Sequence, residues 1–213
     1  MTKQYDVAIL GGGVVGHVLA LLLARDRLRV GLVRHATPPS SAPDIRAYAL
    51  NAASRALLDT LRVWPPAPAE GPASVTPVHS IWVAEPQPDD PASARFDAPP
   101  LQPLSWIVDV PALEATLAQA VAFQPGIDVL AERPNAHLTV ICEGKRSRSR
   151  DQAGFDYDVK PYPQTAVAAR LRTERPHGGV ARQWFIEGHI LALLPLEGES
   201  GHAVALVWSV PHA

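Results

Sequence analysis

The stretch YDVAILGGGVVGHVLALLLA, Tyr5–Ala24, decides the fold of this 213-residue chain. Its first six residues predict a short strand, its glycines predict a tight turn, and the long apolar run after them predicts a helix that is buried on nearly every side. The segment LRVGLV, residues 28–33, predicts a second buried strand. A strand, a helix and a strand within about thirty residues indicate a βαβ unit with two parallel strands.

The glycines of this stretch follow a pattern that phosphate-binding turns use. Gly11, Gly13 and Gly16 match G-x-G-x-x-G between the expected strand and the expected helix. The first glycine permits the tight turn, the second lets the backbone approach a pyrophosphate, and the third lets the helix pack closely on the strand. The helix N-terminus offers unpaired N–H groups to phosphate. The pattern predicts a dinucleotide-binding turn, and the alternative is a glycine-rich turn without a ligand.

The residue after the second strand bears on which dinucleotide is bound. An acid at this position usually holds the ribose hydroxyls. Here the strand leads into Arg34 and His35. An arginine suits a 2′-phosphate and would favour NADP, whereas the alternative is a solvated basic residue in a loop. Composition and spacing leave both interpretations open.

The composition excludes several classes of protein. The hydrophobic content of 47% is sufficient for a core, and a net charge of -2 with mixed signs gives no indication of nucleic-acid binding. The single cysteine, Cys142, cannot form an internal disulfide and fits a reducing compartment. We see no signal-peptide pattern, and the apolar run Val14–Ala24 is too short to span a bilayer. We therefore expect a cytoplasmic protein, and the scattered histidines predict no metal site.

The remaining sequence predicts an α/β protein with a second, antiparallel part. Helices are expected in residues 51–64 and 111–123, and a further strand is expected in residues 137–144. Eleven of the 22 prolines lie between Pro65 and Pro103, which predicts few regular elements there beyond HSIWVAE, residues 79–85. From Thr165 onward, four apolar segments with short turns predict an antiparallel sheet.

These patterns divide the chain into two expected domains. Residues 1–64 and 104–152 are expected to form the Rossmann-like, dinucleotide-binding portion, and residues 65–103 and 153–213 are expected to form the β-rich portion.

Several segments carry a resemblance to a known family. They are DIRAYALNAASRALLDTLRVW (44–64), WIVDVPALEATLAQAV (106–121), ICEGKRSRSR (141–150), YPQTAVAARLRTERPHGGVARQWFIEGHILALLPL (162–196) and VALVWSVP (204–211). In this order they resemble the ubiquinone-biosynthesis hydroxylases, a branch of the flavin-dependent aromatic-ring monooxygenases. ICEGKRSRSR resembles the family motif A-D-G-x-x-S-x-x-R at Gly144, Ser147 and Arg150, with Glu143 in place of aspartate.

The resemblance implies an FAD-binding Rossmann-like domain and a β-rich substrate domain. It implies hydroxylation of a phenolic ring, in the form of a prenylated ubiquinone precursor, with NAD(P)H as co-substrate and O₂. The flavin supplies the chemistry, while the protein orients it and excludes water. A lipid substrate of this kind also implies peripheral association with a membrane.

The resemblance also implies roles for individual residues. Gly11, Gly13 and Gly16 would approach the FAD pyrophosphate, and Arg46 would contact the cofactor near the flavin. Glu143 and Gly144 would lie near the pyrophosphate and the path of the nicotinamide, with Ser147 and Arg150 supporting their turn. No catalytic residue is assigned.

Three features depart from the family pattern. Arg34 replaces the ribose-binding acid, the link between GIDVL and HLTVICEG is short, and the family's second glycine-aspartate motif is not found before Ala213. The chain therefore resembles the first half of such an enzyme, with an apolar surface left without a partner. Three explanations stay open: a complementary chain or biosynthetic complex covers this surface, the chain is a truncated product, or the lineage has shortened the domain. Two other functions stay open. One is a degenerate FAD-fold scaffold, or half of a two-chain enzyme, without activity of its own; the other is an NADP-dependent Rossmann oxidoreductase.

Overall fold

The computed structural model describes residues 4–34, 42–84 and 93–212, and the chain divides into two compact units. The first unit comprises Met1–Ala42, Leu58–Trp64 and Leu113–Val159, and the second comprises Pro43–Leu57, Pro65–Ala112 and Lys160–Ala213. Residues 43–57 and 104–112, which the sequence analysis grouped with the Rossmann-like portion, lie in the second unit, and residues 153–159, which it grouped with the β-rich portion, lie in the first.

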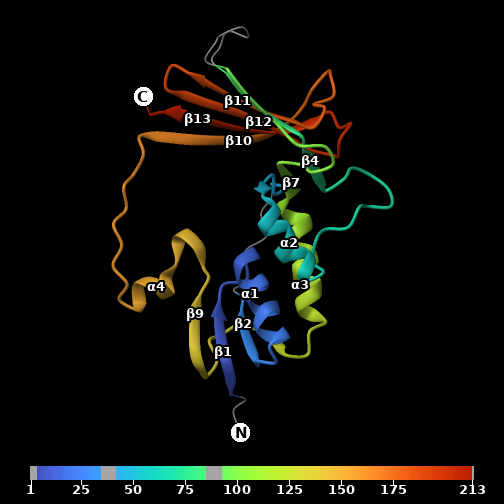
Figure 1. The fold of residues 1–213 in the computed structure, drawn as a ribbon. Helices are drawn as coiled ribbons and strands as arrows, with labels where there is room; N and C mark the ends of the chain where they lie inside the picture. Colours follow the sequence, from blue (N-terminus) through green and yellow to red (C-terminus); the bar gives the residue numbers. More distant parts are fainter. Residues whose placement is uncertain (1–3, 35–41, 85–92, 213) are drawn as a thin grey trace. The chain divides into compact units, whose positions relative to one another are not determined.

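The first unit contains a parallel sheet with the strand order β8-β2-β1-β9 (Figure 1). All three strand pairs are parallel. The strands are β1 (Tyr5–Leu10), β2 (Val30–Val33), β8 (Ile127–Leu130) and β9 (Ala136–Ile141). Helix α1 (Val14–Arg25) connects β1 to β2, so the predicted βαβ unit is confirmed.

Side chains from this sheet and from two helices form the core of the first unit. Ile9, Val30 and Leu32 in the central strands are fully buried. Helix α1 contributes small side chains, Ala20 and Ala24, which let it lie close to the sheet. The helix α3 (Val110–Ala122) presents three buried residues at helical spacing within this unit, namely Leu113, Leu117 and Val121.

The second unit contains a six-stranded and a three-stranded sheet, with the strand orders β10-β13-β12-β11-β5-β6 and β3-β7-β4 (Figure 1). The strands of the larger sheet are β5 (Ser80–Ala84), β6 (Ala94–Asp97), β10 (Gln164–Arg172), β11 (Val180–Ile186), β12 (His189–Pro195) and β13 (Ala203–Pro211). Those of the smaller sheet are β3 (Ala47–Leu50), β4 (Val75–Val78) and β7 (Ser105–Asp109). Strands β10 to β13 pair antiparallel as predicted, whereas β5 joins β11 in parallel.

The proline-rich region holds more regular structure than the sequence predicts. Besides β5 it contributes β4 and β6. Strand β4 contains Pro77, and it lies at the edge of the three-stranded sheet. An edge strand tolerates proline because one of its sides needs no ladder hydrogen bonds.

Two of the helices, α2 (Ala52–Thr60) and α3, begin at residues whose side chains cap them. Asn51 accepts a hydrogen bond from the Ser54 N–H at 2.9 Å at the start of α2, and Asp109 accepts one from the Ala112 N–H at 3.1 Å at the start of α3. A short helix, α4 (Arg148–Gln152), follows β9. Among the helices of the described residues, none has the length and apolar character of a bilayer span.

Candidate functional site

The glycine turn lies at the carboxyl end of β1, and its tight geometry requires glycine at two positions. Gly11 has a φ of 122°, and a Cβ there would overlap the backbone of Cys142. Gly16, one turn into α1, lies so close to the Gly11 carbonyl that a Cβ at residue 16 would overlap that oxygen. These two glycines therefore close the turn and allow the helix to approach the strand.

Gly13 has a different environment. A Cβ at this residue would meet no atom within 4 Å, so the space in front of it is open. Gly13 precedes the first residue of α1, where no side chain caps the helix and no acidic residue lies in the first turn. The N–H groups of this turn remain available to an anion.

His17 stabilises the glycine turn through two hydrogen bonds. This buried side chain has its Nδ1 2.9 Å from the Gly13 carbonyl, which also accepts a hydrogen bond from the His17 N–H at 3.0 Å. Since a carbonyl can only accept, Nδ1 carries the proton. The Gly13 peptide is thus fixed by two donors.

The site lies at a topological switch point of the parallel sheet, where the strand order reverses beside β1. From β1 the chain passes to β2 on one side, and β9 pairs with β1 on the other. The Leu10 carbonyl accepts a hydrogen bond from the Cys142 N–H at 2.6 Å, which places the turn after β9 beside the glycine turn. Ligands of open α/β sheets bind in the crevice outside the carboxyl ends of strands at such a switch point.

Arg34 also reaches the glycine turn. Its N–H donates to the Leu130 carbonyl at 2.9 Å. A Cβ on Gly12 would come within 2.8 Å of the Arg34 Cγ, so the arginine stem lies over the turn. The residue is exposed, and among the described residues no carboxylate forms an ion pair with it. A basic group beside this turn attracts phosphate.

Glu143 organises the turn that follows β9. Its Oε2 accepts hydrogen bonds from the Ser147 hydroxyl at 2.8 Å and from the Ser149 N–H at 3.0 Å, and its Oε1 accepts one from the Ser149 hydroxyl at 2.8 Å. The Ser147 hydroxyl in turn accepts from the Arg150 N–H at 3.1 Å. The Glu143 carboxylate therefore stabilises this turn through hydrogen bonds.

Gly144 and Arg150 complete this turn. Gly144 has a φ of 74°, which favours glycine. The Arg150 guanidinium lies 3.7 Å from the centre of the Tyr157 ring and donates to the Lys145 carbonyl at 3.3 Å. Arg150 and Tyr157 line a hollow of about 430 Å³ beside β9, whose further walls include Thr139, Ile141 and Phe155.

Neither a reactive thiol nor a metal centre is found at this site. Burial raises the pKa of the Cys142 thiol, which keeps it protonated at neutral pH. Among the described residues, no group of three or more histidine, cysteine, aspartate or glutamate side chains could hold a metal ion.

Arg46 lies in the second unit, just before β3. Its guanidinium donates to Asp44 through Nε at 2.9 Å and through Nη2 at 2.5 Å, and its N–H donates to the same carboxylate at 3.0 Å. The Arg46 hydrogen bonds hold the pKa of Asp44 below its ordinary value. The Arg46 carbonyl accepts hydrogen bonds from Val110 N–H at 3.2 Å and from Arg170 Nη2 at 3.3 Å.

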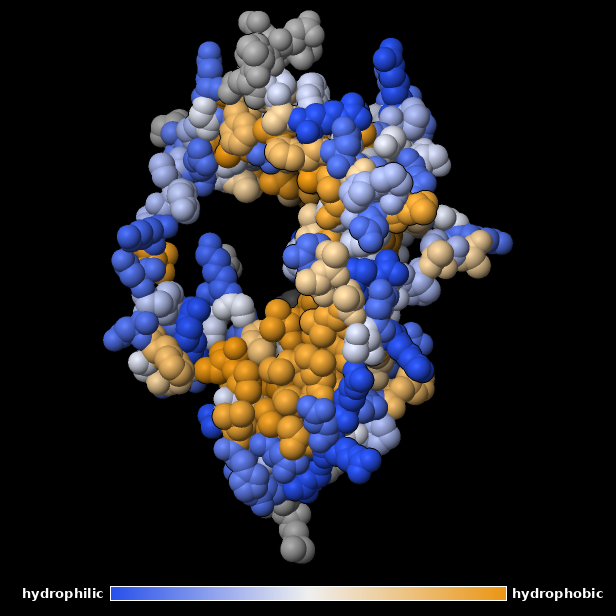
Figure 2. Space-filling view, viewed as in Figure 1, coloured by the Kyte–Doolittle hydropathy of each residue, from blue (hydrophilic) through white to orange (hydrophobic). Residues whose placement is uncertain are grey.

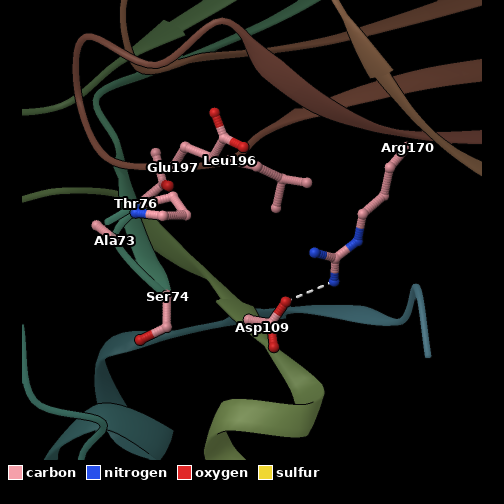
Figure 3. A pocket seen from close by; sticks show the side chains of 8 residues that line it. Ala73, Ser74, Thr76, Asp109, Arg170, Leu196 and Glu197 are labelled. Carbon is pink, nitrogen blue, oxygen red and sulfur yellow. Dashed lines mark hydrogen bonds and ion pairs between the residues drawn. The ribbon is translucent and has the colours of Figure 1, made fainter. Parts of the chain in front are cut away.

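Arg170 is therefore part of the surroundings of Arg46. Its guanidinium also donates to Asp109 Oδ2 at 2.5 Å, and both residues line the pocket shown in Figure 3. That pocket has a volume of about 260 Å³ and is further lined by Ser74, Thr76, Leu196 and Glu197.

The structure gathers most of the expected site residues in the first unit. Gly11, Gly13, Gly16, Arg34, Glu143, Gly144 and Arg150 lie there. Arg46 belongs to the second unit. The sequence analysis did not identify Ser149, Tyr157, Asp44, Asp109 or Arg170. The short spacing of Asp44 and Arg46 could have indicated that they form an ion pair. Arg170 and Asp109 are 61 residues apart, so no local pattern indicates their contact.

Comparison with known proteins gives relatives over nearly the whole chain. The chain is 30% identical over 236 residues to 3-demethoxyubiquinol 3-hydroxylase of Escherichia coli, covering 98% of this chain and 58% of that protein. It is 27% identical over 235 residues to ubiquinone hydroxylase UbiL of Rhodospirillum rubrum, covering 97% of this chain and 52% of that protein. The chain thus spans between half and three fifths of the length of these relatives, and no family model matches it.

Solved structures share the fold. PqsL of Pseudomonas aeruginosa, solved with 2-aminobenzoylacetate, superposes with a TM-score of 0.78 at 17% identity, covering 98% of this chain and 61% of that one. The p-nitrophenol 4-monooxygenase PnpA of Pseudomonas putida gives a TM-score of 0.70 at 14% identity, covering 98% of this chain and 58% of that one. These likenesses confirm the Rossmann-like fold with a β-rich part.

Proposed function

We propose that this chain, a homologue of the ubiquinone-biosynthesis hydroxylases among the FAD-dependent monooxygenases, provides the phosphate-binding turn and the substrate sheet of an enzyme that hydroxylates a phenolic ring. The observation that carries the proposal is the glycine turn at the switch point of the parallel sheet. Its two closing glycines and the open space at Gly13 are what a dinucleotide pyrophosphate requires. FAD would supply the oxygen-activating chemistry.

We assign a separate role in cofactor binding to each residue around the turn. Gly13 and the uncapped N-terminus of α1 bind the pyrophosphate through N–H groups. Arg34 adds a positive charge beside Gly12. Glu143 fixes the adjoining turn through Ser147 and Ser149, so that the backbone after β9 presents a defined edge to the cofactor. Arg46 contacts the cofactor near the flavin.

We propose a prenylated phenol as substrate and NAD(P)H as co-substrate. The E. coli relative is a 3-demethoxyubiquinol 3-hydroxylase by name, which supports a ubiquinone precursor. A lipid of this kind would bring a cytoplasmic enzyme to the membrane surface. In the alternative in which this turn binds a nicotinamide cofactor in place of FAD, Arg34 would favour NADPH over NADH through the 2′-phosphate.

A complementary polypeptide is part of this proposal. Helix α1 carries hydrophobic residues on its outer side, where Figure 2 shows apolar side chains gathered, and Val15 is 68% exposed. In the described part of the chain β9 pairs only with β1, and Leu138 of β9 is 57% exposed. Apolar faces of this kind mark interaction sites. The relatives, which are almost twice as long, contain further sequence that could cover them.

The test compares the chain alone with a reconstituted pair. Purified residues 1–213 should bind FAD weakly and oxidise NADPH slowly, with hydrogen peroxide as the product. Adding the remaining segment of the E. coli relative, separately expressed, should tighten FAD binding and yield hydroxylated product from a prenylated phenol. Efficient hydroxylation by residues 1–213 alone would contradict the need for a partner.

Two other outcomes identify other functions. Protection by NADPH against thermal unfolding, with no effect of FAD, would indicate an NADP-dependent oxidoreductase. Absence of any nucleotide effect, alone and with the added segment, would indicate a scaffold and contradict the proposed function.

A further inference from the structure

Four charged side chains of the second unit alternate in sign around the start of β3. Arg46 is bound to Asp44 by a pair of side-chain hydrogen bonds, and Arg170 is bound to Asp109 at 2.5 Å. The Asp109 side chain is 21% exposed and that of Arg170 is 35% exposed, so this second pair is partly shielded from solvent. The hydrogen bonds of Arg46 hold the pKa of Asp44 below its ordinary value, and the nearby charge of Arg170 acts in the same direction.

The Arg170 guanidinium donates hydrogen bonds to two consecutive backbone carbonyls, those of Ile45 and Arg46, an arrangement that we call the fork. Nε donates to the Ile45 carbonyl at 3.3 Å, and Nη2 donates to the Arg46 carbonyl at 3.3 Å. The same Nη2 donates to Asp109. Arginine can serve several acceptors at once because its donors are held in a rigid plane, which a lysine ammonium cannot reproduce.

Asp109 connects Arg170 to the start of α3 and to the residue before β4. Its Oδ1 caps α3 through the Ala112 N–H, and its own N–H donates to the Ser74 carbonyl at 2.8 Å. The next residue, Val110, donates to the Arg46 carbonyl. The Arg46 backbone is therefore fixed by two elements that are distant in sequence, the strand β10 and the start of α3.

We propose that Arg170, supported by Asp109, is the positioning residue that holds Arg46 for contact with FAD, while Asp44 holds the Arg46 guanidinium in a defined direction. The inference rests on the proposed function. A long exposed side chain loses conformational freedom when it binds a ligand, and holding it beforehand reduces that cost. A loss of the fork should therefore weaken FAD binding through Arg46.

The structural part of the test measures amide hydrogen exchange. Arg170→Met removes the fork and retains apolar length, and it should speed exchange of the Val110 N–H, which donates to the Arg46 carbonyl, at least tenfold. Arg172→Met is the matched control, since Arg172 lies on the same strand, is 74% exposed and pairs with Glu197 at 3.4 Å. Equal exchange at Val110 in the wild type and Arg170→Met would overturn the inference.

The functional part measures FAD affinity by flavin fluorescence, with the complementary segment present. Arg170→Met and Arg46→Met should each weaken binding at least fivefold, and the double variant should be no weaker than the weaker single variant, because both changes remove one contact. Arg170→Lys should restore little, since it lacks the fork. Additive losses in the double variant would overturn the inference.

Gly13→Val separates this inference from the proposed function. If Gly13→Val weakens FAD binding and Arg170→Met does not, the positioning role is wrong and the phosphate turn stands. If FAD titrates the wild type and Gly13→Val equally, the turn is not the cofactor site and the proposed function fails. Should Arg170→Met not fold, Arg170→Lys carries both measurements, because it retains the charge toward Asp109.

Discussion

Gly16 of α1 lies against the carbonyl of Gly11, so close that a side chain at residue 16 would overlap the oxygen. The contact sets the distance between the helix and the end of β1. Gly13, three residues earlier, faces open space. The same motif thus contains two glycines that the fold requires, Gly11 and Gly16, and one that it does not, Gly13, which makes their roles separable by substitution.

We expect Gly16→Ala to destabilise the protein and Gly13→Ala to leave it folded. The methyl group at residue 16 must push the helix away from β1, which should lower the free energy of unfolding by about 3 kcal/mol. Urea unfolding of both variants measures this difference. At Gly13 a larger side chain, as in Gly13→Val, should leave stability within about 1 kcal/mol of the Gly13→Ala value and weaken nucleotide binding about tenfold, which is 1.4 kcal/mol. Equal stability of Gly16→Ala and Gly13→Ala would contradict the packing argument.

Arg34→Glu tests what the residue beside Gly12 recognises. If Arg34 only replaces the ribose-binding acid, the glutamate should strengthen FAD binding by restoring acceptors for the hydroxyls. If Arg34 meets a 2′-phosphate, the change should weaken NADPH binding and leave NADH binding unchanged. Arg133→Glu, at an exposed position of the same unit, controls for the change in net charge. No effect on the three ligands would assign Arg34 to the solvated surface.

Glu143→Ala should loosen the turn after β9. The change leaves two hydroxyls and the Ser149 N–H without their acceptor. A hydrogen bond to a charged group contributes about 1.5–3 kcal/mol net when buried, and water replaces part of these three because the turn is only partly buried. We expect a loss of about 2 kcal/mol in the free energy of unfolding. Glu143→Gln should lose less, because one oxygen still accepts. Glu132→Ala is the exposed control in the same unit.

Local patterns predicted the parts of the fold that local sequence determines. YDVAIL and the glycines after it contain the whole turn, and the structure places β1 and α1 where the pattern does. Strand β3 could not be found in this way. The sequence analysis assigned no strand to the residues AYAL, but Ala49 pairs with Ile107 in β7. This pairing joins segments far apart in sequence, and no local periodicity reports it.

The same limit applies to the candidate site. The glycines and Glu143 stand in recognisable spacings, whereas Arg170 gains its role from Asp109 through tertiary contact alone. His177 is a further case. The residue is only 4% exposed, and its ring forms a hydrogen bond with the carbonyl of Leu196, a tertiary contact that the local sequence does not indicate.

Asp44→Asn should lower the free energy of unfolding at neutral pH and have little effect on it in acid. The hydrogen bonds of Arg46 lower the pKa of the folded Asp44 below its ordinary 3.8, so the carboxylate stabilises the folded state above that value. The contribution is lost as the pH falls from about 4 through the lower folded pKa. Because Asp44 is largely exposed, the effect at pH 7 should be at most about 1 kcal/mol. Urea unfolding of both proteins at pH 7 and pH 2.5 measures it, and an equal difference at the two pH values would contradict the ion-pair explanation.

His177→Ala should destabilise the protein more than alanine at an exposed histidine does. Nδ1 accepts a hydrogen bond from the Gly179 N–H at 3.0 Å, so Nε2 carries the proton and donates to the Leu196 carbonyl at 2.7 Å. The side chain thereby joins the turn before β11 to the end of β12. Its removal leaves a buried donor and a buried acceptor unsatisfied, at about 1–3 kcal/mol each, and opens a cavity. We expect a loss of about 3 kcal/mol in urea unfolding. His79→Ala, at an exposed position in the same unit, should change stability by less than about 0.5 kcal/mol. If the two alanine variants unfold at the same urea concentration, His177 does not join the turns in solution.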